Sequence, residues 1–218
     1  GPALEMVEAA EGAAWDPHID LETGWMWESG MAWALQRLRS VLFEGGQYEA
    51  MMEEVAQLVH RGGVTTIADA GFGGMALPER EIEVLAQVHE GDHVPFRQYL
   101  IPQVGTFKRV YGDEAEDRMA ALSEHASERI RFLDAGKFFA DGAFIAQLMQ
   151  LGEPGYIDGH EGAWMAEPDR IVWHVRPCWN TGKQVHVHVN GDLGMDATLD
   201  AIAELQAEMP RFDHRTVL

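Results

Sequence analysis

The strongest constraint on the fold is an alternation of short apolar stretches with longer helical patterns. Stretches typical of β-strands begin near residues 64, 96, 136, 184 and 215. Between them, apolar residues recur at helical spacing, most clearly at 78–89, 114–130 and 195–209. Strands that alternate with helices, roughly 30 to 50 residues apart, are typical of βα units with parallel pairing. The sequence therefore predicts an α/β fold with parallel strands, barrel-like rather than an open sheet.

The N-terminal part of the chain lies outside this alternation. Helical patterns at 31–43 and 48–60 each end at a pair of glycines, and a short helical piece is predicted at 3–10. Several of the seven tryptophans and eleven methionines fall in this first quarter, which favours a packed hydrophobic layer over a cofactor-binding segment. We therefore predict an N-terminal helical and loop segment at 1–46 and a partial barrel at 47–218.

Composition excludes some classes of partner. The chain has 36 Asp and Glu against 16 Lys and Arg, a net charge of −20 that repels phosphate backbones and anionic membranes. The sequence contains no apolar run of membrane-spanning length and no signal-peptide layout, so we expect a cytoplasmic protein. Its single cysteine, Cys178, rules out an intramolecular disulfide and is expected to be a buried apolar residue rather than a nucleophile.

Two strand-like stretches carry polar groups of chemical interest. One contains Lys137 in an apolar run that ends in an Asp-Gly turn, and the other alternates valine with His186 and His188 before a Gly-Asp turn. Residues two apart in a strand share a face, so the two histidines lie on one side. Such strand ends are typical of a barrel with its active site at the strand C-termini. We predict that Lys137 and His188 point into one cavity, at the C-terminal ends of neighbouring parallel strands.

These residues alone leave several roles open. Lys137 could extend to solvent, pair with a carboxylate such as Asp141 at the barrel rim, or lose its charge. One way to lose the charge is reaction with carbon dioxide, which gives a carbamate that can bridge two cations. His188 could be a hydrogen-bonded core histidine or a zinc ligand, and His186 lies deeper, in the barrel interior or behind the ligands.

Several segments together resemble the metal-dependent amidohydrolase superfamily. They are residues 64–69, 137–142, 185–192 and 214–218, with Tyr156 in a variable loop between the second and third. The branch they resemble most contains the N-substituted formamide deformylase-like proteins (amidohydrolase family 3). The resemblance implies a (β/α)8 TIM-type barrel with one or two zinc-type ions at the strand C-termini. The chain would be an internal fragment covering about strands two to six.

The resemblance also implies roles for individual residues. Lys137 matches the fourth-strand lysine that is often carboxylated as a metal bridge, and His188 matches the fifth-strand metal-binding histidine. Zinc held in this way lowers the pKa of a bound water to about 7, so that it can attack an amide, formamide or related C–N bond. Tyr156 is the expected contact to a small-molecule substrate. No catalytic residue is identified.

The chain also departs from the family pattern. The first-strand His-x-His pair, the sixth-strand Glu-His pair and the eighth-strand aspartate are absent from these 218 residues, and Leu193-Gly194 replaces a more usual Arg-Ala. We therefore expect an incomplete metal site and no substantial activity of the isolated chain. An association with a second copy, or with a missing remainder of the same protein, would cover the open edges of a partial barrel.

Two other functions compete with the hydrolase. One is a non-catalytic barrel fragment that acts only in protein association. The other is a metal-free lyase or isomerase in which Lys137 forms a Schiff base, which borohydride trapping would detect.

A long, glycine-rich segment at 144–166 is predicted to be a mobile loop over the mouth of the barrel. Tyr156 is its expected substrate contact, and His160 is expected to be solvent-exposed rather than a ligand. The segment that follows, 167–181, is predicted to be partly helical, with Pro177 kinking or ending the helix.

Overall fold

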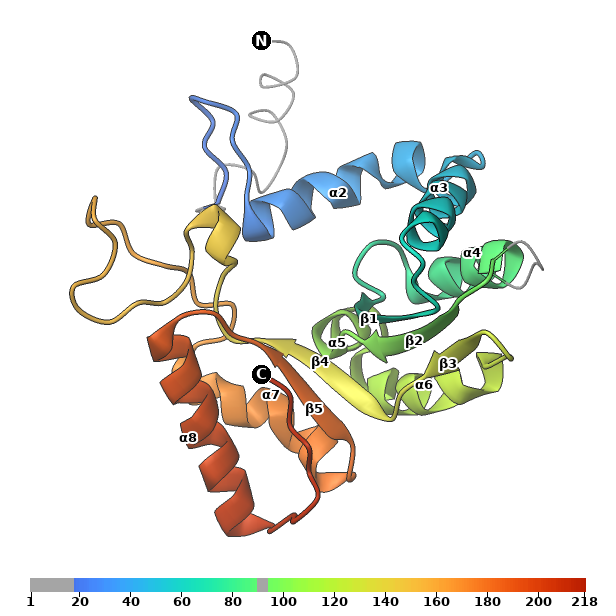
Figure 1. Ribbon diagram of the computed structural model, residues 1–218. Coiled ribbons are helices and arrows are strands. Elements are labelled where there is room, and N and C mark those ends of the chain that lie inside the picture. The colour runs from blue at the N-terminus through green and yellow to red at the C-terminus, as the bar shows by residue number, and fades with distance from the viewer. Residues whose placement is uncertain (1–17, 90–93) are drawn as a thin grey trace. The chain divides into compact units, whose positions relative to one another are not determined.

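The computed structural model describes residues 18–89 and 94–218 of the chain (Figure 1). The short helix expected at 3–10 lies outside the described residues. The chain divides into two compact units, Gly1–Met51 and Met52–Leu218, and each is described by itself. Within the described residues, the structure has no helix with the length and apolar character that a membrane crossing requires.

The first unit is built around helix α2 (Glu28–Leu42), close to the predicted span. Before the helix, Ile19 pairs antiparallel with Met26, and the His18 carbonyl accepts a hydrogen bond from the Trp27 amide at 3.1 Å. Gly30 allows the close approach of this segment to the helix, because a Cβ there would lie 2.2 Å from the His18 carbonyl oxygen. Helix α3 (Gln47–Arg61) follows and crosses the boundary between the units.

The second unit contains parallel strands in chain order. They are β1 (Thr66–Phe72), β2 (Arg97–Pro102), β3 (Ile130–Phe132), β4 (Ala135–Phe139) and β5 (Gln184–His188). Parallel pairing joins β1 to β2, β2 to β3 and β4 to β5. A parallel bridge from Gln103 to Lys137 links the end of β2 to β4, and another from His186 to Val217 adds a further parallel partner to β5. The predicted parallel α/β arrangement is confirmed, and the described residues form no closed barrel.

Helices connect and cover these strands. They are α4 (Pro78–His89), α5 (Val104–Tyr111), α6 (Ala115–Ala121), α7 (Pro168–Asn180) and α8 (Asp192–Glu208), with 3-10 turns η2 (Gly112–Glu114), η3 (Leu122–His125) and η4 (Phe144–Ala146). The single helix predicted at 114–130 is wrong. Gly112, at φ +57°, ends α5, and the chain then forms the short pieces η2, α6 and η3, the last ending at His125, before β3 begins at Ile130.

Pro177 does not end its helix. Helix α7 continues through Pro177 to Asn180, and the Pro177 carbonyl accepts bonds from both the amide and the hydroxyl of Thr181. Proline removes one backbone donor, and in the last turn that loss leaves the rest of the helix intact. The alternative that Pro177 ends the helix is therefore wrong, and the kink stays a prediction.

The core of the second unit lies between the strands and their helices. Helices α7 and α8 pack against one another beside β4 and β5 (Figure 1). The buried residues of this cluster include Phe72, Leu100, Val104, Phe107, Val175, Cys178, Trp179, Val185, Val187 and Leu205. Because successive strand residues alternate between faces, the burial of Val185 and Val187 directs His186 and His188 to the other face of β5.

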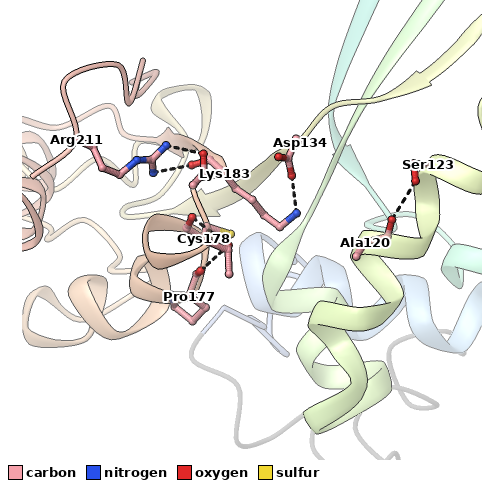
Figure 2. A network of polar contacts seen from close by, with 9 residues as sticks. Ala120, Ser123, Asp134, Pro177, Cys178, Lys183 and Arg211 are labelled. Carbon is pink, nitrogen blue, oxygen red and sulfur yellow. Dashed lines mark hydrogen bonds and ion pairs between the residues drawn. The ribbon is translucent and has the colours of Figure 1, made fainter. Parts of the chain in front are cut away.

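Polar contacts fix the ends at which β4 and β5 begin (Figure 2). The Lys183 ammonium lies 2.5 Å from an Asp134 carboxylate oxygen, and the Arg211 guanidinium donates to the carbonyl of Lys183 at 3.0 Å. Arg211 also donates to the carbonyl of Gly182 at 2.6 Å. These bonds fix the end of the strand pair at which both strands begin.

Candidate functional site

The register of β4 and β5 decides which site residues face one another. Lys137 pairs with His186, and Phe139 pairs with His188. All four alternate with buried residues, so they share the face of the strand pair that points away from the helices. Lys137 and His188 lie on neighbouring parallel strands and on one face, and their pointing into one cavity stays a prediction. They are not level, however, because His188 lies one pair of residues closer to the C-terminal end.

Lys137 is half-buried without a compensating carboxylate. Its Nζ lies 5.3 Å from the ring centroid of Phe139, and it forms no ion pair within residues 18–89 and 94–218. Burial alone lowers the pKa of Lys137, because the charged amine loses hydration and gains no counterion. The interpretation of Lys137 as a salt-bridged residue at a barrel rim is therefore wrong. An amine in this environment is closer to the neutral, nucleophilic form than an ordinary lysine.

Asp141 does not neutralise Lys137 because its oxygens are already occupied. The side chain is fully buried and accepts backbone hydrogen bonds from Asn190 at 2.8 Å, Gly191 at 2.7 Å and Gln150 at 3.0 Å. Backbone N–H donors stabilise a buried carboxylate by replacing its hydration. Asp141 therefore fixes the loop after β4 to the turn after β5, a structural role that the sequence analysis did not assign.

The same carboxylate explains one departure from the family pattern. A Cβ at Gly194 would lie 2.9 Å from Oδ2 of Asp141, closer than a side-chain carbon normally comes. Alanine at this position would require the Asp141 carboxylate or helix α8 to shift. Glycine at 194 is thus a consequence of how closely α8 approaches Asp141.

The two histidines of β5 have different surroundings. The side-chain amide of Asn190 lies 2.8 Å from Nε2 of His188 and also donates to the Gly142 carbonyl at 3.1 Å. His186 Nε2, in contrast, is buried and has no hydrogen-bond partner. Burial and then the nearby Lys137 charge lower the pKa of His186, which keeps the ring neutral at about pH 7.

These residues fit part of a metal site. Lys137, His186 and His188 contribute nitrogen atoms to one face, and Nε2 of His186 has no hydrogen-bond partner. Within the part of the chain that the structure describes, no three His, Cys, Asp or Glu side chains come together in a group that could hold a metal ion. A carbamate on Lys137 would add the oxygen ligands and the negative charge that this face lacks.

The loop after β4 is held by many internal bonds. Trp164 forms an antiparallel bridge with Asp141, and the amide of Ala163 donates to the Leu148 carbonyl at 2.9 Å. The Tyr156 hydroxyl accepts a hydrogen bond from the Met149 amide at 2.9 Å. A cavity of about 390 Å³ lies within this loop, with Tyr156 among its lining residues. Tyr156 therefore combines a structural hydroxyl bond with a position beside open volume, and its contact with substrate stays a prediction.

His160 is fixed within this loop as well. Its ring stacks on Tyr156 with centroids 4.0 Å apart, and its two nitrogens lie 2.5 Å from an Asp158 oxygen and 2.7 Å from the Gln147 carbonyl. The Gln147 carbonyl and then Asp158 raise the pKa of His160. One third of the side chain is exposed (33%), which agrees with the expectation that His160 is solvent-accessible.

A second buried carboxylate organises the loop after β1. Glu81 accepts backbone hydrogen bonds from Gly73 at 2.8 Å, Met75 at 3.0 Å and Ala76 at 2.7 Å. Burial raises the pKa of Glu81, while these three donors act in the opposite direction. The sequence analysis missed this residue. The signal available was an acidic residue in the first turn of α4, soon after a glycine-rich stretch that has many backbone donors to satisfy.

Comparison with known proteins places these features in context. No family model matches the chain. The chain is 28% identical over 143 residues to the "Putative amidohydrolase YtcJ" of Bacillus subtilis (strain 168), a match that covers 65% of this chain and 25% of that protein. The matched region thus spans about a quarter of the length of this curated relative.

Two solved structures share the fold. An uncharacterized metal-dependent hydrolase from Pyrococcus furiosus matches with a TM-score of 0.59 and 20% identity, over 94% of this chain and 41% of that one. Another from Pyrococcus horikoshii OT3 matches with a TM-score of 0.61 and 17% identity, over 93% and 38%. The chain therefore has the fold of a portion of these metal-dependent hydrolases. Its sequence is also similar to part of a protein named as an amidohydrolase.

Proposed function

We propose that this chain is part of a metal-dependent hydrolase of the amidohydrolase superfamily, in the branch of the N-substituted formamide deformylase-like proteins. It would form about strands two to six of a (β/α)8 barrel. Parallel strands in chain order, with helical structure after β1, β2, β4 and β5, support this arrangement. The sequence similarity to an amidohydrolase and the shared fold of two metal-dependent hydrolases also support it. The single cysteine is consistent with a cytoplasmic location.

The observation that carries the proposal is the nitrogen-rich face of β4 and β5. Lys137, His186 and His188 share this face, and Asp141, the carboxylate that follows β4, is fully occupied by backbone donors. Burying a lysine without a counterion costs free energy, and titratable groups perturbed in this way cluster at functional sites. We assign Lys137, as a carbamate, and His188 to the binding of a divalent ion, which we take to be zinc.

The reaction would be hydrolysis of an amide, formamide or related C–N bond in a small molecule. A divalent ion bound here supplies a Lewis acid and lowers the pKa of a water to about 7. The chain's own residues fix the surroundings. Asn190 lies against the His188 ring, Asp141 joins the loop after β4 to the turn after β5, and Tyr156 lines the cavity in that loop.

A second candidate function is association without catalysis. The absence of a three-residue ligand group in the described ranges favours it for this polypeptide taken alone. Strand β1 also favours association. Within the described residues it has a partner strand on one side only, and its residues Thr66, Ala68 and Asp69 are exposed. A second copy of the chain, or a remainder of the same protein, would then cover the open edges.

Zinc binding separates the two candidates. After dialysis against zinc and bicarbonate, we expect less than about one tightly bound zinc per chain, and less again in Lys137→Met and His188→Ala. A panel of N-formyl and N-acyl amines, assayed with zinc, tests for turnover, which we expect to be low for the chain alone. Equal zinc binding by the wild type and both variants would contradict the assignment of Lys137 and His188. Concentration-dependent association with no effect of either variant on zinc would favour the non-catalytic function.

A further inference from the structure

The two histidines of β5 have separate tasks at this face. His188 already has a neighbour at Nε2, the Asn190 amide at 2.8 Å, and that amide is oriented by its bond to the Gly142 carbonyl. His186 has its Nε2 buried and unpartnered. A buried ring nitrogen without a partner is destabilising, so it indicates a group that the polypeptide alone does not supply.

The register identifies where that missing group would lie. His186 is directly opposite Lys137 on the adjacent strand, and both side chains are on the same face. Neighbouring strands lie about 4.8 Å apart, so side chains of paired residues lie next to one another. The position of an acceptor for His186 is thus beside the end of the Lys137 side chain.

We infer that His186 is a positioning residue that donates a hydrogen bond from Nε2 to a carbamate oxygen on Lys137. This rests on the proposed function, in which Lys137 is carboxylated. The lone pair of the Lys137 nitrogen would form a bond to the carbon of carbon dioxide, and one C–O π electron pair would move onto oxygen to give the carboxylate. The proton lost from the amine nitrogen would pass to solvent. The product has two acceptor oxygens where the free amine had none.

The surroundings favour a histidine donor in this role. A carbamate needs donors or cations to hold its charge away from bulk water. In the part of the chain described here, the charged side chain of this face is Lys137 itself, and Asp141 is bonded to the backbone of Gln150, Asn190 and Gly191. The N–H of His186 is therefore the donor that the strand pair itself offers to an oxygen on Lys137.

The test measures the carbamate directly rather than an activity. Metal-free protein is titrated with ¹³C-bicarbonate, and the carbamate carbon is followed by ¹³C NMR. We expect a carbamate resonance in the wild type and none in Lys137→Arg. In His186→Ala the bicarbonate concentration for half-saturation should rise about tenfold, as expected for loss of a hydrogen bond to a charged group. His186→Gln, which retains an N–H donor, should restore much of the affinity, and His125→Ala, at an exposed histidine in η3, should leave it unchanged.

Each outcome supports or overturns the inference. An unchanged affinity in His186→Ala, with a carbamate still present, would overturn it and leave the proposed function standing. An equal loss in His125→Ala and His186→Ala would do the same. Absence of any carbamate in the wild type would overturn both this inference and the carboxylated Lys137. Circular dichroism and thermal melts of each variant show whether the fold is retained, and His186→Gln serves where His186→Ala unfolds.

Discussion

Lys137 lies opposite His186, and His188 lies opposite Phe139, in the parallel pairing of β4 and β5. Lys137 and His186 are therefore directly opposite one another. His188, the proposed metal ligand, lies one residue pair nearer the C-terminal ends of the strands. This arrangement leaves Lys137 beside an aromatic ring and a neutral imidazole, with no carboxylate to hold its charge.

Replacing Lys137 by methionine should raise the stability of the protein at neutral pH. Burial lowers the Lys137 pKa from 10.5, so the folded state disfavours the charged amine. The wild type should gain stability as pH rises from the folded-state pKa towards 10.5, and its difference from Lys137→Met should shrink over that window. Urea unfolding at several pH values measures this. Lys183→Met is the matched control and should lose stability, because Lys183 pairs with Asp134.

Replacing Asp141 by alanine should destabilise the second unit strongly. Three backbone amides, those of Gln150, Asn190 and Gly191, would lose their acceptor in a buried place. We expect a loss of about 3 kcal/mol or more in the free energy of unfolding, measured by urea titration. The control is Asp213→Ala, which removes an exposed partner of Arg215 and should have little effect. A similar midpoint for both variants would contradict the role assigned to Asp141.

The His160 pKa should fall when Asp158 is replaced by asparagine. The Gln147 carbonyl and Asp158 both raise it, so Asp158→Asn should leave a smaller elevation that comes from Gln147. NMR titration of the His160 ring protons measures the shift, and Asp213→Asn should leave it unmoved.

The same group makes the loop sensitive to pH. A raised folded-state pKa means that protonated His160 stabilises the loop below about pH 6.5, and that this stabilisation disappears as pH rises through the folded-state pKa. Neutral imidazole has one N–H and cannot donate to both Gln147 and Asp158. Hydrogen exchange in residues 147–160, corrected for intrinsic rates, should therefore become faster above that pKa.

Alanine at position 191 should be poorly tolerated. A Cβ at Gly191 would lie 2.0 Å from the Gln150 carbonyl oxygen, a backbone atom that cannot move without breaking the bond from Gln150 to Asp141. We expect a lower melting temperature for Gly191→Ala. Gly105→Ala is the opposite case, because Gly105 lies in α5 with no atom within 4 Å of the added carbon. That variant should gain about 0.5 to 1 kcal/mol from the better helix propensity of alanine.

Cys178 should react slowly with thiol reagents. The side chain is buried, and burial raises the pKa of the thiol to about 11, so little thiolate is present at neutral pH. The rate of labelling with a disulfide reagent should be limited by global unfolding. Low concentrations of urea should raise this rate only in proportion to the unfolded fraction of the protein. Rapid labelling of the native protein would show that Cys178 is accessible.

Much of the second unit could be predicted from sequence because it depends on local patterns. Valine and histidine alternate in β5 with a period of two. This pattern predicted that the segment is a strand and that His186 and His188 lie on the same face of it. Helix α4 begins at Pro78, a residue suited to a first helical turn, and its bounds agree with the pattern.

The register and the loop anchors could not be predicted in this way. Which residue of β5 lies opposite Lys137 depends on how two strands align across the 44 residues of chain between them (140–183), and the apolar pattern leaves that alignment free by steps of two. Pairing of Asp141 with Lys137 was one of the alternatives left open by the sequence. Its actual partners, the amides of Gln150, Asn190 and Gly191, are backbone groups, which every sequence has and which no pattern marks. Local sequence likewise gives no sign of β3, because three residues are too few for a periodicity.

The three bonds of Asp141 have a consequence for how this face could be altered. One end of the loop after β4 and the turn after β5 are held by the same side chain, so neither can be displaced without the other. The stretch between Gln150 and Ala163 begins after this shared anchor and returns at the bridge beside Trp164. A changed sequence in this stretch should leave Lys137 and His188 in place if Tyr156 keeps its bond to Met149 and His160 its bond to Gln147, which makes the stretch the natural position for exchanging one loop sequence for another.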